Sequence, residues 1–251
     1  MALSVSITAE PLFEIGHHAI TNSIFTSALV TIFLIYMIIK FANKKLDLIP
    51  KAYSLQNILE IIFEGFFNLY KSVLSERKAK KYFPILTTIF LYILFSNWTE
   101  LLPGLGSIGL NIVHHGEKVF VPILRAPTAD LNTTFALAIV AFIFIQYNGI
   151  KELGADYFKK FFINPIKKPI YTFVGFLELV GEFTKIISFA FRLFGNIFAG
   201  EVLLAVMTFL FPLFTTIPFL GMELFVGIIQ AFVFMMLMLV FVAGAIEPHH
   251  S

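Results

Sequence analysis

Apolar residues gather into long stretches along this chain, and short polar connections separate them. The stretches at 22–41, 83–102 and 132–150 each have about the length, roughly 20 residues, that a helix needs to cross a bilayer. A longer stretch covers 170–211, and a last one covers 219–246. The pattern therefore predicts an all-α polytopic membrane protein with about five membrane-embedded helices.

The stretch at 170–211 is too long to stand upright in a membrane. As one helix it would extend roughly 63 Å, about twice the thickness of the hydrocarbon layer. It is either a single tilted helix or two spans joined by a turn near Gly181 or Gly195. Because no cluster of polar turn residues interrupts it, the pattern favours one helix, which would form a long, strongly tilted hairpin with 219–246.

The segment 54–75 has the pattern of an amphipathic helix that lies in the membrane interface. Its apolar residues form one stripe, and its polar residues lie away from that stripe. The apolar set is Leu55, Ile58, Leu59, Ile62, Phe66 and Leu69, and the polar set is Gln56, Glu60, Glu64 and Asn68. A fifth conventional span is the alternative, and the distribution of basic residues argues against it.

Basic residues are concentrated in three of the connections. Of the 18 Lys and Arg residues, 14 lie in 40–51, 71–81 and 151–168. Short cytoplasmic loops are enriched in these residues, so we expect all three connections on the cytoplasmic side, which requires that 54–75 does not cross. The N-terminal arm 1–21 has none and the loop 103–131 has only Lys118 and Arg125, so both are predicted outside, with the C-terminus in the cytoplasm.

Composition agrees with a membrane protein and excludes several kinds of chemistry. Hydrophobic residues make up 58% of the 251 positions and charged residues 14%, against roughly 25% charged residues in a soluble domain. This leaves 1–251 as a single membrane domain that we expect to be no enzyme on its own. The chain has no cysteine, which excludes disulfides and thiolate metal sites. Its first residues lack the basic start of a signal peptide, so we expect the mature chain to keep them.

Arg192 is the most informative charged residue because its neighbours in FRLFGNIFAGE are almost all apolar. An arginine inside a membrane costs at least roughly 2.5 kcal/mol and by default marks an ion pathway. Glu178 and Lys185 precede it at intervals of seven residues, which places them on one side of the helix with Ser188 and Asn196. In the alternative interpretation, Arg192 only holds helices together by pairing with a glutamate, either Glu178 or Glu201.

Further polar residues lie on the other side of Arg192. Glu201 follows it by nine residues, about 180° around the helix, and Glu223 and Gln230 lie seven residues apart on one face of the last helix. Carboxylates can relay protons, whereas a guanidinium keeps its charge, blocks a direct leak and attracts the carboxylate of a moving partner. The pattern predicts two polar routes that end near Arg192.

The segment FRLFGNIFAGE at 191–201 resembles the signature of subunit a of F-type ATP synthases, the membrane stator that faces the rotating ring of c subunits. The segments ELFVGIIQAFVFMML at 223–237, SNWTELLPG at 96–104 and PTADLNTTFALA at 127–138 are also similar to the family. The resemblance covers nearly the whole chain.

The resemblance implies a role for each of the polar residues. Arg192 would oppose the ring carboxylate, with Gln230 and Asn196 close to it. The outer half-channel would use Glu201 and Glu223, with Asn97 and Glu100 near its mouth, and the cytoplasmic half-channel would be lined by Glu178 and Ser188. The implied partners are the c-subunit ring, the peripheral stalk b subunits and membrane lipid, with H⁺ or Na⁺ as the transported ion. No cofactor, metal or nucleic acid is expected. The bacterial plasma membrane is favoured over the mitochondrial inner membrane.

Two further patterns predict no site. Gly104–Gly109 spells the dinucleotide-binding motif but has no strand before it and no clear helix after it, so we interpret it as a turn. The adjacent histidines at 17–18, 114–115 and 249–250 have no acidic partner at a fixed spacing, and we expect them in solvated loops and tails.

Two other classes of function stay open at this point. A secondary transporter would have repeated halves around a site at the membrane midplane, whereas the polar residues here concentrate after residue 170. A membrane-embedded assembly factor would have no reason to keep Arg192, Glu201, Glu223 and Gln230 aligned.

Overall fold

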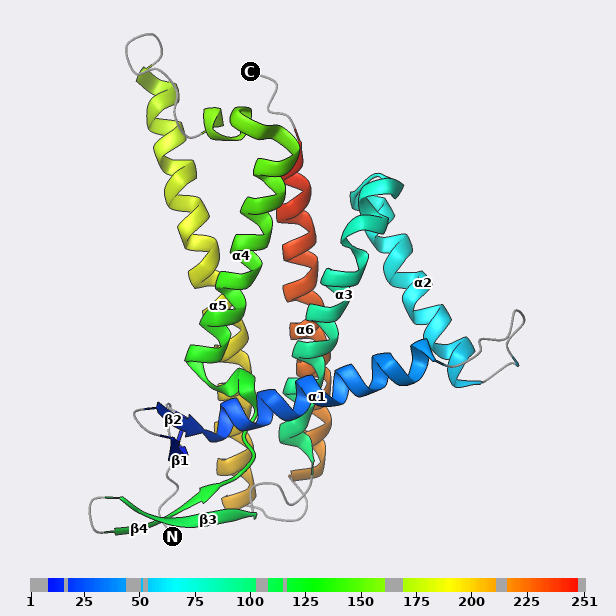
Figure 1. Ribbon diagram of the computed structural model, residues 1–251. Coiled ribbons are helices and arrows are strands. Elements are labelled where there is room, and N and C mark those ends of the chain that lie inside the picture. Colours follow the sequence, from blue (N-terminus) through cyan, green and yellow to red (C-terminus); the bar gives the residue numbers. More distant parts are fainter. Residues whose placement is uncertain are drawn as a thin grey trace.

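The structure is a computed structural model that describes residues 9–15, 18–43, 51, 54–102, 108–114, 117–160, 169–210 and 216–247. Helices dominate this part of the chain, and two small antiparallel β-hairpins lie at one end of the molecule (Figure 1). The helices are α1 (Asn22–Ala42), α2 (Leu55–Val73), α3 (Glu76–Trp98), α4 (Leu131–Leu153), α5 (Pro169–Leu210) and α6 (Thr216–Ile246). Short 3-10 helices are η1 (Thr99–Leu101), η3 (Pro127–Ala129) and η4 (Gly154–Lys160).

The long apolar stretches form helices close to the predicted bounds. Within the described residues, four helical segments are long and apolar enough to cross a membrane, namely Asn22–Ala42, Leu131–Phe158, Thr172–Leu210 and Ile217–Ile246. Helix α5 runs without interruption over 42 residues, so no turn forms at Gly181 or Gly195. Pro212 follows shortly after its last residue and cannot continue a helix. The polytopic all-α membrane class is confirmed.

Helix α3 differs most from its predicted bounds. The hydrophobic pattern predicted a span over 83–102, but α3 begins at Glu76 and ends at Trp98, with Pro84 inside it. The basic segment 71–81 is therefore mostly helical, and only Leu74 and Ser75 separate α2 from α3. Charged residues in the first turns are compatible with a helix whose start extends beyond its apolar part, which is why hydropathy alone places the start too late.

The two β-hairpins were not predicted. Strands β1 (Pro11–Ile15) and β2 (His18–Thr21) pair in the N-terminal arm, and β3 (Gly109–His114) pairs with β4 (Glu117–Pro122) in the loop between α3 and α4. Each strand is short, and antiparallel pairing with its neighbour satisfies its backbone hydrogen bonds locally. The hairpins add a small β component to an otherwise helical chain.

A core between α3, α4, α5 and α6 holds the molecule together. Buried side chains from each helix meet in it, including Ile93, Ile145, Leu193 and Met235. Small residues at 138, 141, 190 and 231 are fully buried and let the helix backbones approach closely. Helices α5 and α6 pack as an antiparallel hairpin along one side of α3 and α4 (Figure 1).

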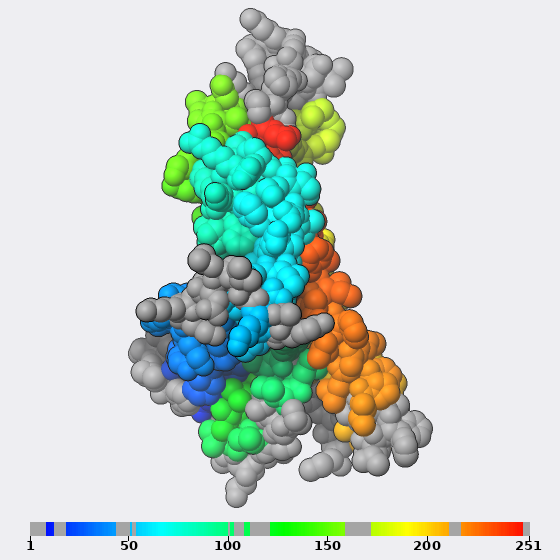
Figure 2. All heavy atoms as spheres, turned by 90° about the vertical axis from the view of Figure 1, so that its right-hand side faces the viewer, coloured from blue at the N-terminus to red at the C-terminus, as the bar shows by residue number. Residues whose placement is uncertain are grey.

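Helix α1 lies across the direction of the other long helices. It runs across the long axis of α4, α5 and α6 in Figure 1, and its blue atoms lie next to the lower end of α2 in Figure 2. Much of its apolar surface is exposed, with Ile32 at 63% and Ile38 at 56%. Exposed apolar residues on a helix of a membrane protein are expected to face lipid or partner chains. The crossing therefore gives α1 and the α5–α6 hairpin different inclinations to any membrane that contains both.

A buried aspartate joins the start of α1 to the start of α4. Asp130 is 3% exposed, and its carboxylate caps α4 by accepting from the Asn132 backbone N–H at 3.2 Å. Ser23 Oγ donates to the same carboxylate at 3.0 Å, and Thr133 Oγ1 donates at 3.1 Å. This cap fixes the crossing of α1 over the N-terminus of α4.

Candidate functional site

Arg192 lies near the middle of α5, half-buried, with neutral partners on its own helix. Its Nη2 donates to Ser188 Oγ at 2.9 Å, and Asn196 Nδ2 donates to the Arg192 carbonyl at 3.0 Å. These contacts follow from the helical repeat, because residues four apart lie one above the other. Among the residues that the structure describes, no carboxylate lies within ion-pair distance of Arg192. The alternative that Arg192 pairs with Glu178 or Glu201 is therefore wrong for the described part of the chain.

A groove between α5 and α6 leads along the helices to Arg192. Its volume is about 390 Å³, and its lining includes Thr184, Lys185, Ser188 and Arg192. Leu237 and Phe241 of α6 form part of the opposite wall. Most of the other lining residues are apolar, so the hydroxyl groups and cations form a polar strip along one wall that ends at the guanidinium.

The counter-ion of Lys185 is Glu182, not the predicted neighbour on its stripe, Glu178. Lys185 Nζ donates to Glu182 Oε1 at 2.8 Å, and Gln146 Nε2 of α4 donates to Glu182 Oε2 at 2.8 Å. Tyr157 Oη of η4 in turn donates to Gln146 Oε1 at 2.5 Å. This chain of hydrogen bonds connects the wall of the groove to the end of α4.

Glu201 forms an ion pair with a residue that the sequence pattern placed in an outer loop. Arg125 Nη2 lies 3.0 Å from Glu201 Oε2, and the side chain of Arg125 is only 7% exposed. The backbone N–H of Arg125 donates to Thr26 Oγ1 of α1 at 3.3 Å. Glu201 thus faces α1 and the segment before η3, away from the Ser188 side of α5, as its position nine residues after Arg192 predicts.

Glu223 of α6 is buried against α5 at Gly200, the residue before Glu201. It is 3% exposed, and its carboxyl group occupies the space that a side chain at Gly200 would need. Its Oε1 has no hydrogen-bond partner in the described part of the protein. A buried carboxyl oxygen without a partner is costly, and such groups concentrate at functional sites. The Glu223 carboxyl group therefore packs against the backbone of α5 one residue before Glu201, whose own side chain pairs with Arg125.

Asn97 joins three elements close to Glu223. Its Nδ2 donates to the Gly227 carbonyl of α6 at 3.0 Å, and its Oδ1 accepts from Thr128 Oγ1 of η3 at 2.7 Å. Asn97 is 3% exposed. Gly227 lies one turn after Glu223, so Asn97, Glu201 and Glu223 belong to one polar region between α3, α5, α6 and η3.

The remaining predicted residues are less closely connected. Glu178 and Gln230 are half-buried on α5 and α6. Glu100 lies in η1, and its side chain is outside the described residues. Most of the glycine motif at 104–109 and the side chains of the three histidine pairs also lie outside them.

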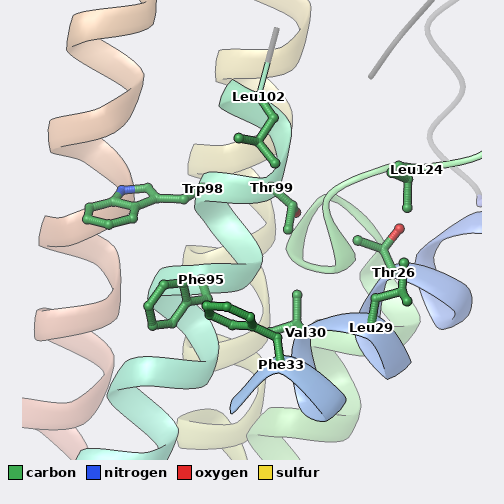
Figure 3. A pocket seen from close by; sticks show the side chains of 9 residues that line it. All are labelled: Thr26, Leu29, Val30, Phe33, Phe95, Trp98, Thr99, Leu102 and Leu124. Carbon is green, nitrogen blue, oxygen red and sulfur yellow. The ribbon is translucent and has the colours of Figure 1, made fainter. Parts of the chain in front are cut away.

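A second cavity, between α1 and α3, has a different character. It measures about 390 Å³ and is lined mainly by apolar side chains, among them Leu29, Phe33, Phe95 and Leu124 (Figure 3). The rings of Phe33 and Phe95 pack edge to face, with 5.3 Å between their centroids, and line one side of the cavity. Among its lining residues, only Thr26, Thr99 and Trp98 carry a polar side-chain group, so this cavity suits hydrocarbon and not an ion.

Sequence reasoning missed the partners that come from other elements, namely Arg125, Thr128, Gln146 and Glu182. Arg125 was counted as an outer basic residue, although its position five residues before Asp130, the N-cap of α4, already places it next to a membrane helix. Glu182 carried one available signal, because it precedes Lys185 by three residues and such pairs face each other on a helix.

Comparison with known proteins gives consistent matches over nearly the whole chain. Residues 23–243 match the family described as ATP synthase A chain. A protein of Gloeobacter violaceus named ATP synthase subunit a is 31% identical over 246 residues, which cover 98% of this chain and 92% of the relative.

Proposed function

Because the chain belongs to the ATP synthase subunit a family, we propose that it carries protons between the membrane surfaces and the c-subunit ring through two offset half-channels. Subunit a is a non-catalytic membrane subunit of the Fo sector, so the chain makes no ATP by itself. The proposal depends most on one observation: Arg192 stands at the end of an open groove with Ser188 as its side-chain partner.

The ring is the proposed source of the missing negative charge. Large apolar residues on the same helix are exposed, including Phe183 at 58%, Ile187 at 52% and Phe191 at 51%. A helix that presents such residues around a single arginine suits contact with a hydrophobic helix that carries a carboxylate. The guanidinium would stabilise the charged form of that carboxylate and drive off its proton.

The groove beside Arg192 is the proposed cytoplasmic half-channel. Thr184 and Ser188 supply hydroxyl groups along it, and Glu178 lies six residues before Thr184 on α5. Protons released from the ring carboxylate would leave through this groove. Asn196 and Gln230 are proposed to lie next to the arginine on the side of the ring.

The polar region around Gly200 is the proposed end of the outer half-channel. Glu201 and Glu223 would pass protons toward the ring, and Asn97, with Glu100 nearer the mouth, would hold water at the entrance. The buried position of Glu223 and the ion pair of Glu201 with Arg125 support distinct roles for the two acids.

The assembly and location follow from the same proposal. The partners are the c-subunit ring, the peripheral stalk b subunits and surrounding lipid, and the transported ion is H⁺. We propose that α1 crosses the membrane and that the α5–α6 hairpin, which α1 crosses in Figure 1, lies strongly tilted in it. The N-terminus is placed outside and the C-terminus in the cytoplasm of a bacterial plasma membrane.

Replacement of Arg192 with alanine tests the proposal. Arg192→Ala is expected to abolish ATP-driven proton pumping in inverted membrane vesicles while the complex still assembles. Arg192→Lys keeps the charge but loses the planar fork, so it should retain at most a small part of the activity. Pumping by Arg192→Ala at the normal rate would refute the mechanism.

On a blue-native gel, migration of the chain without a small hydrophobic ring protein would favour a transporter instead.

A further inference from the structure

Glu182 is a buried carboxylate to which the proposed proton route assigns no role. It is 5% exposed and lies on α5, ten residues before Arg192. A buried charge is costly unless it is paired and hydrogen-bonded. Lys185 Nζ and Gln146 Nε2 each donate to it at 2.8 Å, one to each oxygen. The carboxylate is therefore held between α4 and the groove wall.

Lys185 lines the same groove as Arg192, seven residues before it on α5. This separation corresponds to roughly 10 Å along the helix axis. The Lys185 ammonium also lies 4.6 Å from the centroid of the Phe241 ring on the opposite wall. Without Glu182, a second positive charge would stand in the path between the groove mouth and the arginine.

The chain behind Glu182 suits a fixed support and not a proton relay. Gln146 donates to Glu182 with its amide nitrogen and accepts from Tyr157 Oη with its amide oxygen. A side-chain amide has no titratable proton in the physiological range, so it holds its neighbours without passing protons between them. The Tyr157 ring packs against Gly149, where a side chain would overlap it, and this fixes the far end of the chain.

We infer that Glu182 is a positioning residue that neutralises Lys185, so that protons and the ring carboxylate meet Arg192 without competition from a second cation. The inference rests on the proposed function, because it assigns the groove to proton exit. At roughly 10 Å and an effective dielectric constant of about 20, an uncompensated charge is expected to slow the passage of a proton on the order of tenfold.

The test uses the assembled complex in inverted membrane vesicles and compares ATP-driven proton pumping. Glu182→Gln keeps the shape and a hydrogen bond to Gln146 but removes the charge, and it is expected to slow pumping roughly tenfold. Glu182→Gln combined with Lys185→Gln removes both charges and is expected to recover pumping to within about twofold of the normal rate. Recovery in the double variant distinguishes neutralisation from a purely structural role of these contacts, because removing Lys185 as well cannot repair contacts that Glu182→Gln has weakened.

The matched control is an ion pair of the same chemistry outside the groove. Lys81 Nζ lies 2.6 Å from Glu152 Oε1, with both side chains partly exposed, and this bond raises the pKa of Lys81. Glu152→Gln should pump at the normal rate, since exposed pairs contribute little.

Normal pumping by Glu182→Gln, or equally slow pumping by the double variant, would overturn the inference. If Glu182→Gln fails to assemble, the double variant decides: restored assembly supports neutralisation, and failed assembly overturns it. Arg192→Ala in the same vesicles keeps the two proposals apart. Loss of pumping there together with normal pumping by Glu182→Gln would remove only the role of Glu182.

Discussion

Arg192 keeps its charge available because its side-chain hydrogen bond goes to a hydroxyl group. The bond to Ser188 at 2.9 Å orients the guanidinium but does not neutralise it. An ion pair with a carboxylate of the same chain would compete with any incoming carboxylate, since a paired guanidinium has to break one strong contact to make another. Arg125, in contrast, is committed to Glu201. The charge of Arg125 is thus neutralised within the chain, whereas that of Arg192 is not.

Gly200 is the residue at which a small change should have a large effect. The Glu223 carboxyl group fills the space next to it, so Gly200→Ala forces Glu223 or the packing of α5 on α6 to shift. Overpacking of this kind costs about 1–3 kcal/mol. We expect Gly200→Ala to lower the thermal stability of the purified complex and to slow proton pumping.

Gly221, on α6, provides the matched control for Gly200. No atom lies within 4 Å of a Cβ built at Gly221, whereas the carboxyl group of Glu223 blocks that position at Gly200. Gly221→Ala should therefore leave stability and pumping close to normal. Equal behaviour of the two variants would show that Glu223 does not occupy the space beside Gly200 in the working complex.

At the scale of the element, hydrophobic patterning predicts helices well and their starts less well. Helix α5 begins at Pro169 and ends at Leu210, one residue from the predicted 170–211 at each end, because proline marks both limits. Helix α3 begins seven residues before the predicted span, since its first turns carry charges that hydropathy assigns to a loop. The β-hairpins were not predicted for a related reason, because short strands in a polar loop give only a weak periodic signal.

In the site too, contacts within one helix could be predicted from the sequence, whereas contacts between different elements could not. The contacts of Arg192 with Ser188 and Asn196 could be predicted, because the helical repeat fixes which residues share a face. The pairing of Arg125 with Glu201 could not be predicted, because it depends on how a segment before η3 packs on α5. Periodicity gives angles around one axis and carries no information about which helices lie side by side.

The cap at Asp130 tests how the elements are joined. Asp130→Ala removes the N-cap of α4 and leaves the Ser23 hydroxyl of α1 without this acceptor, so it should lower the free energy of unfolding by about 1–3 kcal/mol. Thermal unfolding of the purified complex measures the loss. Ser54→Ala, which removes the single bond that caps α2, is the control and should cost less. A larger effect at Ser54 would show that the Asp130 contacts do not hold α1 and α4 together.

At the scale of the whole molecule, the crossing of α1 over the hairpin limits how the protein sits in a membrane. If α1 stands upright, the long axis of α5 and α6 has to lie strongly tilted, and the tilt explains how a helix of 42 residues fits within a bilayer. Helix α2 then turns back beside α3 through Leu74 and Ser75. Exposed Leu55 and Ile61 on α2 suit contact with lipid at the surface of the bilayer.

Cysteine labelling tests this arrangement directly, because the chain has no cysteine of its own. Single cysteines at Lys51, Lys78 and Lys151 are all predicted on the cytoplasmic side, so an impermeant maleimide should label them in inverted vesicles. A cysteine at Lys118 in β4 should react only from the opposite side. Lys51 and Lys78 flank α2, so labelling of these two positions from opposite sides would mean that α2 crosses the membrane. The interfacial position of α2 and the strong tilt of the hairpin would then both have to be abandoned, because an upright α2 beside α3 requires a different inclination of the whole bundle.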